Sequence, residues 1–221
     1  MTENRLNRMK SVLDKRQLDL RVFLEKVHKP HNLSAILRSC DAVGVSQVHA
    51  VLPDEQYRAT RRHSAGNGQW VDVEIHDDSV QAIKKLQGQG FTVYAANLTD
   101  DAVCYTSVDY TKPSVVLMGT EKYGVSPEAS AAVDANIIIP MMGMGQSLNV
   151  SVATAVILYE AQRQRSEKGM YDSVKFDKET YNTKLFEWMQ PKMATYCKRK
   201  GIEYPEIDED GAIVELDPDY R

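Results

Sequence analysis

A short polar group, Gln146 to Asn149, lies between a glycine loop and an apolar helical run in the stretch GMGQSLNVSVATAVILYE (143–160). The side chains of Ser147 and Asn149 can cap such a helix, because each can accept a hydrogen bond from a free backbone N–H. Glycines and exposed N–H groups at a helix start also favour an electron-rich ligand. These residues alone leave both interpretations open, a helix cap and a binding site.

Two further loops, 96–98 and MGTEKYGVS (118–126), each follow an apolar run typical of a strand. In open α/β sheets, ligands lie beyond the carboxyl ends of the strands, so three loops are candidates for one site. The dinucleotide fingerprint and the P-loop are both missing, which leaves a nucleotide-like ligand open outside a Rossmann cradle. Ser147 also lacks the second glycine of a nucleophile elbow, which argues against a serine hydrolase.

Strand-like and helical segments alternate along residues 20–165, which predicts an α/β fold with a mainly parallel sheet and flanking helices. We expect three parts: a basic helical extension at 1–19, the α/β domain at 20–165, and a helical extension with an acidic tail at 166–221. Pro191 predicts a break or a kink within the last part. In the helix after residue 30, Asn32 is the expected cap.

The net charge of −4 argues against simple non-specific adhesion to nucleic acid, but an acidic tail offsets two basic groups, at 1–29 and 57–63. The three cysteines are widely separated, and neither they nor the five histidines have a metal-site spacing, so we expect no metal. The chain has no run typical of a membrane helix or a signal peptide, which predicts a cytoplasmic location and no membrane partner.

Three segments, NLSAILRSCDAVG (32–44), VVLMGTEKYGVS (115–126) and IIIPMMGMGQSLNVSVATAVILYE (137–160), resemble the motifs of the SPOUT RNA 2'-O-ribose methyltransferases. The resemblance implies a SPOUT fold with a C-terminal deep trefoil knot, S-adenosyl-L-methionine as methyl donor, and a homodimer whose sites are completed by the partner. The flanks, KRQLDLRVFLEKVHKPHN (15–32) and YEAQRQR (159–165), resemble the family's tRNA guanosine-2'-O-methyltransferases.

This closer resemblance implies methylation of the ribose 2'-OH of the D-loop guanosine at tRNA position 18. Two alternatives stay open: an rRNA ribose 2'-O-methyltransferase of the same superfamily, and a catalytically inactive RNA-binding protein. The rRNA enzymes commonly carry a separate N-terminal RNA-binding domain, and the short segment before residue 20 favours tRNA. The intact motif residues argue against an inactive protein.

The resemblance also assigns roles to individual residues. The implied catalytic residues are Arg38, Asn32, Glu121, Ser147 and Asn149. The implied cofactor-binding residues are Ala96, Asn97, Met118, Gly119, Ile139, Met144, Ser147 and Leu148. The candidates for tRNA phosphates are Arg8, Arg16, Arg21, Arg58, Arg61 and Arg62.

Arg38 has two possible roles in methyl transfer, as a general base or as a clamp on phosphate and developing alkoxide charge. A guanidinium has a pKa of roughly 12.5–13.8 and stays charged, which favours the clamp. Without the resemblance, Arg38 is a surface cation and Glu121 a solvated loop acid.

Overall fold

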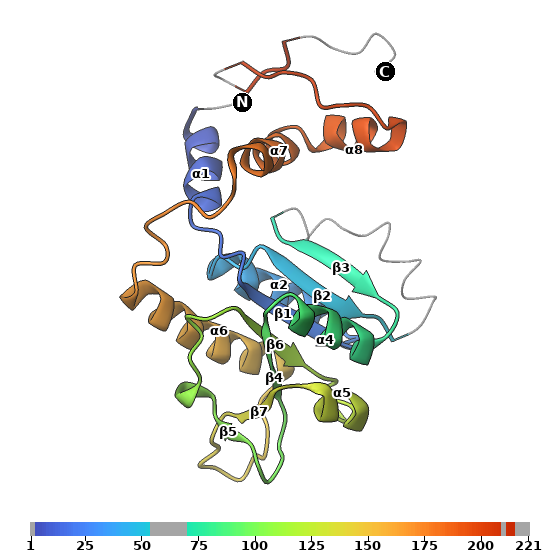
Figure 1. Cartoon of the computed structure of the whole chain (residues 1–221), viewed down its shortest axis with the longest axis vertical. Helices are drawn as coiled ribbons and strands as arrows, with labels where there is room; N and C mark the ends of the chain where they lie inside the picture. Colours follow the sequence, from blue (N-terminus) through green and yellow to red (C-terminus); the bar gives the residue numbers. More distant parts are fainter. Residues whose placement is uncertain (1–2, 54–69, 209–210, 215–221) are drawn as a thin grey trace. The chain divides into compact units, whose positions relative to one another are not determined.

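The computed structural model describes residues 3–53, 70–208 and 211–214 (Figure 1). The chain divides into two compact units. The larger unit is Gln17–Met170, and the smaller unit joins Met1–Arg16 to Tyr171–Arg221. The two ends of the chain therefore meet in one unit, although the sequence suggests two separate extensions.

Seven strands form one sheet in the larger unit, in the order β3-β2-β1-β6-β4-β7-β5, and every pairing is parallel. The strands are β1 (Leu20–Glu25), β2 (Gln47–Val51), β3 (Asp72–His76), β4 (Thr92–Ala96), β5 (Val103–Cys104), β6 (Ser114–Met118) and β7 (Ala135–Ile138). All five residues of β6 are buried, as expected for a central strand of a parallel sheet covered on both faces.

Helices cover both faces of this sheet (Figure 1). They are α2 (Pro30–Ala42), α4 (Ser79–Gly88), α5 (Pro127–Ala132) and α6 (Val150–Glu167), with a short 3-10 helix η2 (Tyr105–Ser107). Apolar residues of α2 and α6 share one buried cluster with β1 and β2, and those of α4 and α5 share another with β4 and β6. The predicted α/β class with a mainly parallel sheet is confirmed; the trefoil knot stays a prediction.

Two strands, β3 and β5, lie outside the predicted elements, because both are edge strands with mixed polarity or little length. The predicted capping role of Asn32 is wrong. Lys29 precedes α2 without a side-chain cap, and Pro30 opens the helix. Proline suits this position because it has no N–H to satisfy. The amide of Asn32 is therefore available for a contact outside its own helix.

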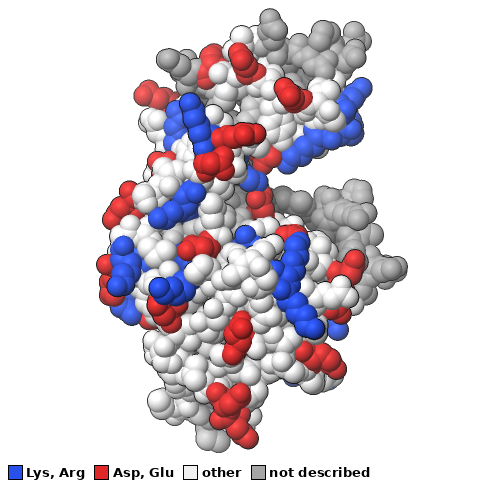
Figure 2. Space-filling model, in the orientation of Figure 1, with Lys and Arg blue, Asp and Glu red and all other residues white. Residues whose placement is uncertain are grey.

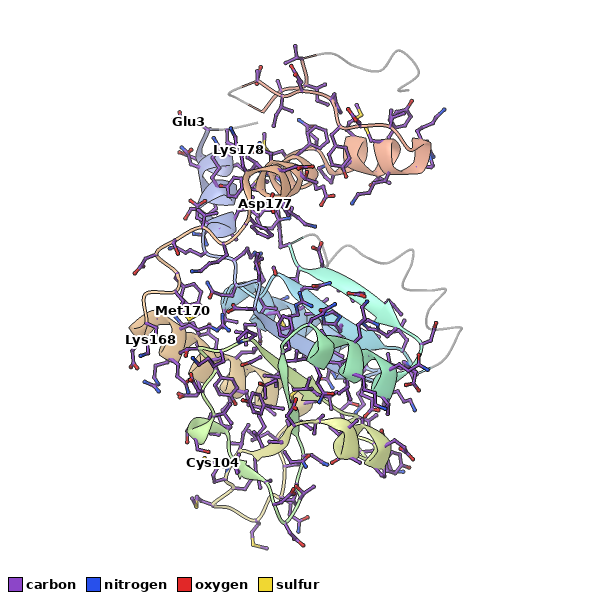
Figure 3. All side chains as sticks on the ribbon, viewed as in Figure 1. Glu3, Cys104, Lys168, Met170, Asp177 and Lys178 are labelled. Carbon is purple, nitrogen blue, oxygen red and sulfur yellow. The ribbon has the colours of Figure 1, made fainter. Side chains whose placement is uncertain are left out.

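The start and end of the larger unit are held together by the fully buried side chain of Arg165 near the end of α6. Its guanidinium donates to Asp19 Oδ1 at 2.5 Å and to Gln17 Oε1 at 3.0 Å. Gln17 Nε2 in turn donates to the carbonyl oxygen of Met170 at 3.2 Å. Lys168 and Met170 are labelled at this end of α6 in Figure 3.

The smaller unit contains three helices, α1 (Glu3–Leu13), α7 (Lys178–Met189) and α8 (Pro191–Lys200). Helices α1 and α7 pack together, and the hydroxyl of Tyr181 donates to Asp14 at 2.8 Å. The boundary between α7 and α8 falls at Gln190, directly before Pro191, so the predicted break is confirmed. Asp177, labelled beside Lys178 in Figure 3, caps α7 by accepting from Thr180.

Candidate active site

A cavity of about 400 Å³ lies at the carboxyl ends of β4, β6 and β7. Its walls come from the three loops that the sequence singles out: 96–98 after β4, 118–124 after β6, and 137–148 from β7 toward α6. Parallel strands place these loops at one edge of the sheet, although they are far apart in the chain. A volume of this size is in the range of small-molecule sites.

The loop after β6 folds back on itself in a tight turn. Thr120 and Gly124 exchange two backbone hydrogen bonds, of 2.8 and 3.0 Å. A Cβ at Gly119 would lie only 2.1 Å from the backbone carbonyl of Gly124, and Gly124 itself has a φ of +67°. Glycine is therefore required at both positions, at the first by close approach and at the second by conformation.

Three polar residues from distant parts of the chain meet beside the cavity. Asn32 is 1% exposed, its Nδ2 donates to Glu121 Oε1, and its Oδ1 accepts from Asn149 Nδ2 at 3.3 Å. Asn149 also caps α6, because its Oδ1 accepts from the backbone N–H of Ser151 at 2.8 Å. The predicted capping role of Asn149 is confirmed, and the same side chain takes part in the polar cluster.

The carboxylate of Glu121 is held ionised in this cluster. Burial raises the pKa of Glu121, but hydrogen bonds from its own backbone and from Asn32, with the positive charges of His28 and Lys29, bring this pKa below its usual value. His28 Nδ1 lies 3.6 Å from Oε2. This oxygen is buried and has no hydrogen-bond partner among the described residues. A buried carboxylate oxygen without a donor is suited to accept one from a ligand.

Most of the implied cofactor-binding residues line the cavity. They are Ala96, Asn97, Met118, Gly119, Ile139, Ser147 and Leu148. Met144 does not line it, and its side chain is fully exposed. The amide of Asn97 donates to Ser130 Oγ at 3.2 Å, and Ser130 donates to Asn136 Oδ1 at 3.1 Å. Asn97 is thereby fixed in place by residues of α5 and β7.

The sequence interpretation does not assign a role to several other lining residues. Examples are Thr120, Tyr123, Ile137 and Gln146. Their place in the two glycine-containing loops was the available signal, but side-chain type alone does not tell which loop residues point inward. Ser147 is exposed at the cavity and is not the N-cap of α6.

Arg38 lies on α2 with an exposed side chain. Within the part of the chain that the structure describes, its guanidinium makes no hydrogen bond or ion pair. The structure therefore brings Asn32, Glu121 and Asn149 together but leaves Arg38 outside this cluster.

The predicted RNA-contacting arginines have different environments. Arg8 is exposed on α1, whereas Arg16 is 1% exposed and lies over the ring of Trp188, with 5.2 Å from its guanidinium carbon to the ring centroid. Arg21 stacks on Phe91 at 4.3 Å, so its guanidinium is engaged within the fold. The remaining candidates, Arg58, Arg61 and Arg62, lie outside the described residues.

One group of potential metal ligands, His49, Glu74 and His76, gathers on neighbouring strands β2 and β3. Arg21 Nη1 lies 3.4 Å from His49 Nε2, and an arginine can only donate, so this nitrogen accepts. His49 Nδ1 then carries the proton and faces His76 Nε2 at 2.9 Å. Lys85 donates to Glu74 at 2.8 Å. The group is a hydrogen-bonded network with its own cations, and the expectation of no metal stays a prediction.

Among the described residues, no helix combines the length and the apolar character needed to cross a membrane.

Comparison with known proteins connects this geometry to a family. The SpoU rRNA Methylase family matches residues 19–159, and the family's C-terminal region, described as "SpoU, rRNA methylase, C-terminal", matches residues 163–216. The tRNA (guanosine(18)-2'-O)-methyltransferase of Escherichia coli (strain K12) is 47% identical over 222 residues, which cover 100% of this chain and 96% of that protein.

Solved structures agree with this assignment. The A. aeolicus TrmH/SpoU tRNA modifying enzyme superposes with a TM-score of 0.77 at 45% identity, covering 84% of this chain and 95% of that chain. An AdoMet-bound rRNA methyltransferase from Sinorhizobium meliloti has a TM-score of 0.57 at 30% identity and covers 70% of this chain and 59% of that chain. The motif residues, the parallel sheet with its cavity, and these matches together show that the chain belongs to the SpoU methylase family.

Proposed function

We propose that this protein transfers a methyl group from S-adenosyl-L-methionine to the ribose 2'-OH of the guanosine at position 18 in the D loop of tRNA. The observation that carries this function is the cluster of Asn32, Glu121 and Asn149 at the edge of a cavity in a chain 47% identical to an enzyme of that name. Each of the three residues comes from a different motif, so the fold assembles all three motifs at one place.

The cavity suits the methyl donor in size and chemistry. Ile139 and Leu148 offer apolar surface for an adenine face, and the close approach of the backbone at Gly119 leaves main-chain groups available at the wall. When bound, S-adenosyl-L-methionine supplies a methyl group on a sulfonium, which an oxygen nucleophile displaces in line. No metal is needed for this chemistry. Positioning of the two reactants therefore supplies much of the rate.

The polar cluster orients the nucleophile. Glu121 Oε2 is buried without a donor and is suited to accept a hydrogen bond from the ribose hydroxyl. Asn32 fixes the carboxylate through Oε1, and Asn149 fixes Asn32. Arg38, which stays charged, binds a neighbouring phosphate and stabilises the alkoxide charge that develops as the 2'-OH loses its proton.

We infer a homodimer from the apolar surface near the cavity. Exposed apolar side chains include Met142 and Met144 of the loop before α6 and Val152 and Tyr159 on α6. Figure 2 shows mainly uncharged side chains, with a few acidic ones, over β5 and the loop that leads to α6. Exposed apolar patches mark interaction surfaces. A second copy on this surface would also supply an Arg38 to each site.

The dimer is tested by light scattering after gel filtration. We expect the wild type to have twice the chain mass and Val152→Asp to shift toward the monomer. A monomeric wild type at micromolar concentration would contradict the dimer and leave the methyl-transfer proposal to its own test.

A tRNA substrate supports a cytoplasmic location and an electrostatic contribution to binding. Arg8 is exposed and available for a phosphate, so we expect binding to weaken as salt increases.

The reaction is tested with labelled S-adenosyl-L-methionine and unmodified tRNA and rRNA, followed by mapping of the labelled nucleotide. We expect 2'-O-methylguanosine at tRNA position 18. Transfer to rRNA without transfer to tRNA would contradict the proposed substrate, and a methylated base would contradict the ribose chemistry.

A further inference from the structure

An exposed aromatic side chain lies at the mouth of the cavity. Tyr123 lines the cavity and is 77% exposed. Among the exposed large hydrophobic residues in the described part of the chain, only Tyr123 and Tyr159 are aromatic, and Tyr159 does not line the cavity. An exposed tyrosine ring at a ligand site offers a flat apolar face without any cost in burying it elsewhere.

The backbone that carries this ring is fixed. The N–H of Tyr123 donates to Thr120 Oγ1 at 3.0 Å, and Thr120 and Gly124 are bridged by two backbone hydrogen bonds. The close approach at Gly119 holds the base of the turn against Gly124. The ring is therefore presented from a rigid turn, which lowers the ordering cost of binding a ligand against it.

One turn presents two different chemical groups. Glu121 points inward, with a side chain that is 13% exposed, and Tyr123 two residues later points outward. Two residues span at most about 7 Å of extended chain, so carboxylate and ring lie within the length of one nucleoside. The ammonium of Lys122 lies 4.8 Å from the centroid of the Tyr123 ring and adds a positive charge beside it.

A loop nucleotide of RNA needs such a surface. When its ribose enters a site, its base leaves its neighbours in the stack, and RNA-binding proteins commonly receive unstacked bases on aromatic rings. We propose that Tyr123 is the stacking surface for the base of the nucleotide whose ribose is methylated, with Lys122 beside it for an adjacent phosphate. This inference rests on the proposed function, because it takes the ribose to lie at Glu121.

Three variants separate the ring from its other properties. Tyr123→Phe keeps the aromatic face and removes the hydroxyl, Tyr123→Leu keeps apolar surface and removes the aromatic face, and Lys122→Ala removes the charge. Because Tyr123 is exposed, we expect all three variants to fold like the wild type. We expect Tyr123→Leu to lower kcat/KM for tRNA about ten-fold. Tyr123→Phe should stay within about two-fold of the wild type, since the ring face remains.

A spectroscopic readout follows the base directly. A tRNA with 2-aminopurine in place of the target guanosine is bound in the presence of S-adenosylhomocysteine, and its fluorescence is measured. We expect quenching with the wild type and Tyr123→Phe, and less quenching with Tyr123→Leu. Affinity for S-adenosyl-L-methionine should be equal in all three proteins.

Several results would overturn the stacking role. They are a Tyr123→Leu variant with wild-type kcat/KM and quenching, an equal loss in Tyr123→Phe, or weakened binding of S-adenosyl-L-methionine, which would assign the ring to the methyl donor. The quenching needs no methyl transfer. A wild type that quenches without methylating tRNA would therefore refute the proposed function and not the stacking.

Discussion

Substitution of Gly119 by alanine tests whether the turn after β6 builds the cavity. The new Cβ would lie 2.1 Å from the Gly124 carbonyl, about 1.3 Å short of an ordinary 3.4 Å contact. Both neighbours are backbone atoms, so the strain cannot be relieved by a side-chain rotation. The least costly adjustment opens the two hydrogen bonds between Thr120 and Gly124. Each contributes about 1 kcal/mol, which gives a loss of about 2 kcal/mol in the free energy of unfolding.

The assay compares Gly119→Ala with Gly143→Ala. No atom lies within 4 Å of a Cβ at Gly143, and its φ is outside the left-handed region, so this alanine fits without strain. Both changes restrict the unfolded chain equally, and this effect cancels in the comparison. We expect Gly119→Ala to melt about 4–8 °C below Gly143→Ala.

Isothermal titration with S-adenosyl-L-methionine measures the consequence for the site. Displacement of this turn moves the wall of the cavity and the residue that follows it, Glu121. We therefore expect at least about ten-fold weaker binding to Gly119→Ala, since ligand sites lose affinity steeply when their geometry shifts by about 1 Å. Equal melting temperatures and equal affinities for the two variants would refute the steric reasoning.

Three other substitutions test separate features of the molecule. Arg165→Met leaves the Asp19 carboxylate and two backbone carbonyl groups without donors, and we expect a loss of about 3 kcal/mol in urea unfolding; an unchanged midpoint would contradict this. Burial, followed by the charge of Arg21, lowers the pKa of His49 from 6.5 to about 4. The unfolded chain then binds more protons between these values, so stability falls as pH decreases from 6.5 toward 4, by about 2 kcal/mol at pH 5. His49→Gln should flatten this slope, and an equal slope would exclude His49 as its source. Arg38→Ala should reduce kcat by about 100-fold or more, while Arg38→Lys retains more activity as a monodentate phosphate ligand; equal loss in both would oppose the clamp.

The strongly patterned elements could be predicted from sequence because their cause is local. Central strands such as Ser114–Met118 are continuous apolar runs, and helix α6 follows a glycine loop with Asn149 at its cap. Edge strands could not be predicted in the same way. Asp72–His76 mixes apolar and charged residues because only part of it is covered, so its pairing with β2 depends on the rest of the sheet.

The role of Asn32 illustrates what local rules miss. Asparagine favours helix caps, and its position near a helix start suggested that role. Pro30 begins the helix earlier, so the Asn32 amide lies in the first turn and donates to Glu121, a residue 89 positions away. Arg16 and Arg21 are similar cases: their charge suggested RNA contacts, but each packs on an aromatic ring.

By itself the sequence determined the fold class, the three loops and the motif residues, because apolar periodicity, glycine positions and short motifs are properties of neighbouring residues. Only the tertiary structure decided which of these residues meet. The parallel order of β4, β6 and β7 brings the loops to one edge, where Asn32, Glu121 and Asn149 form a single hydrogen-bonded cluster. The same order leaves Arg38 exposed and presents Tyr123 at the mouth of the cavity. Contacts between distant residues depend on how the whole chain packs, and no local pattern carries that information.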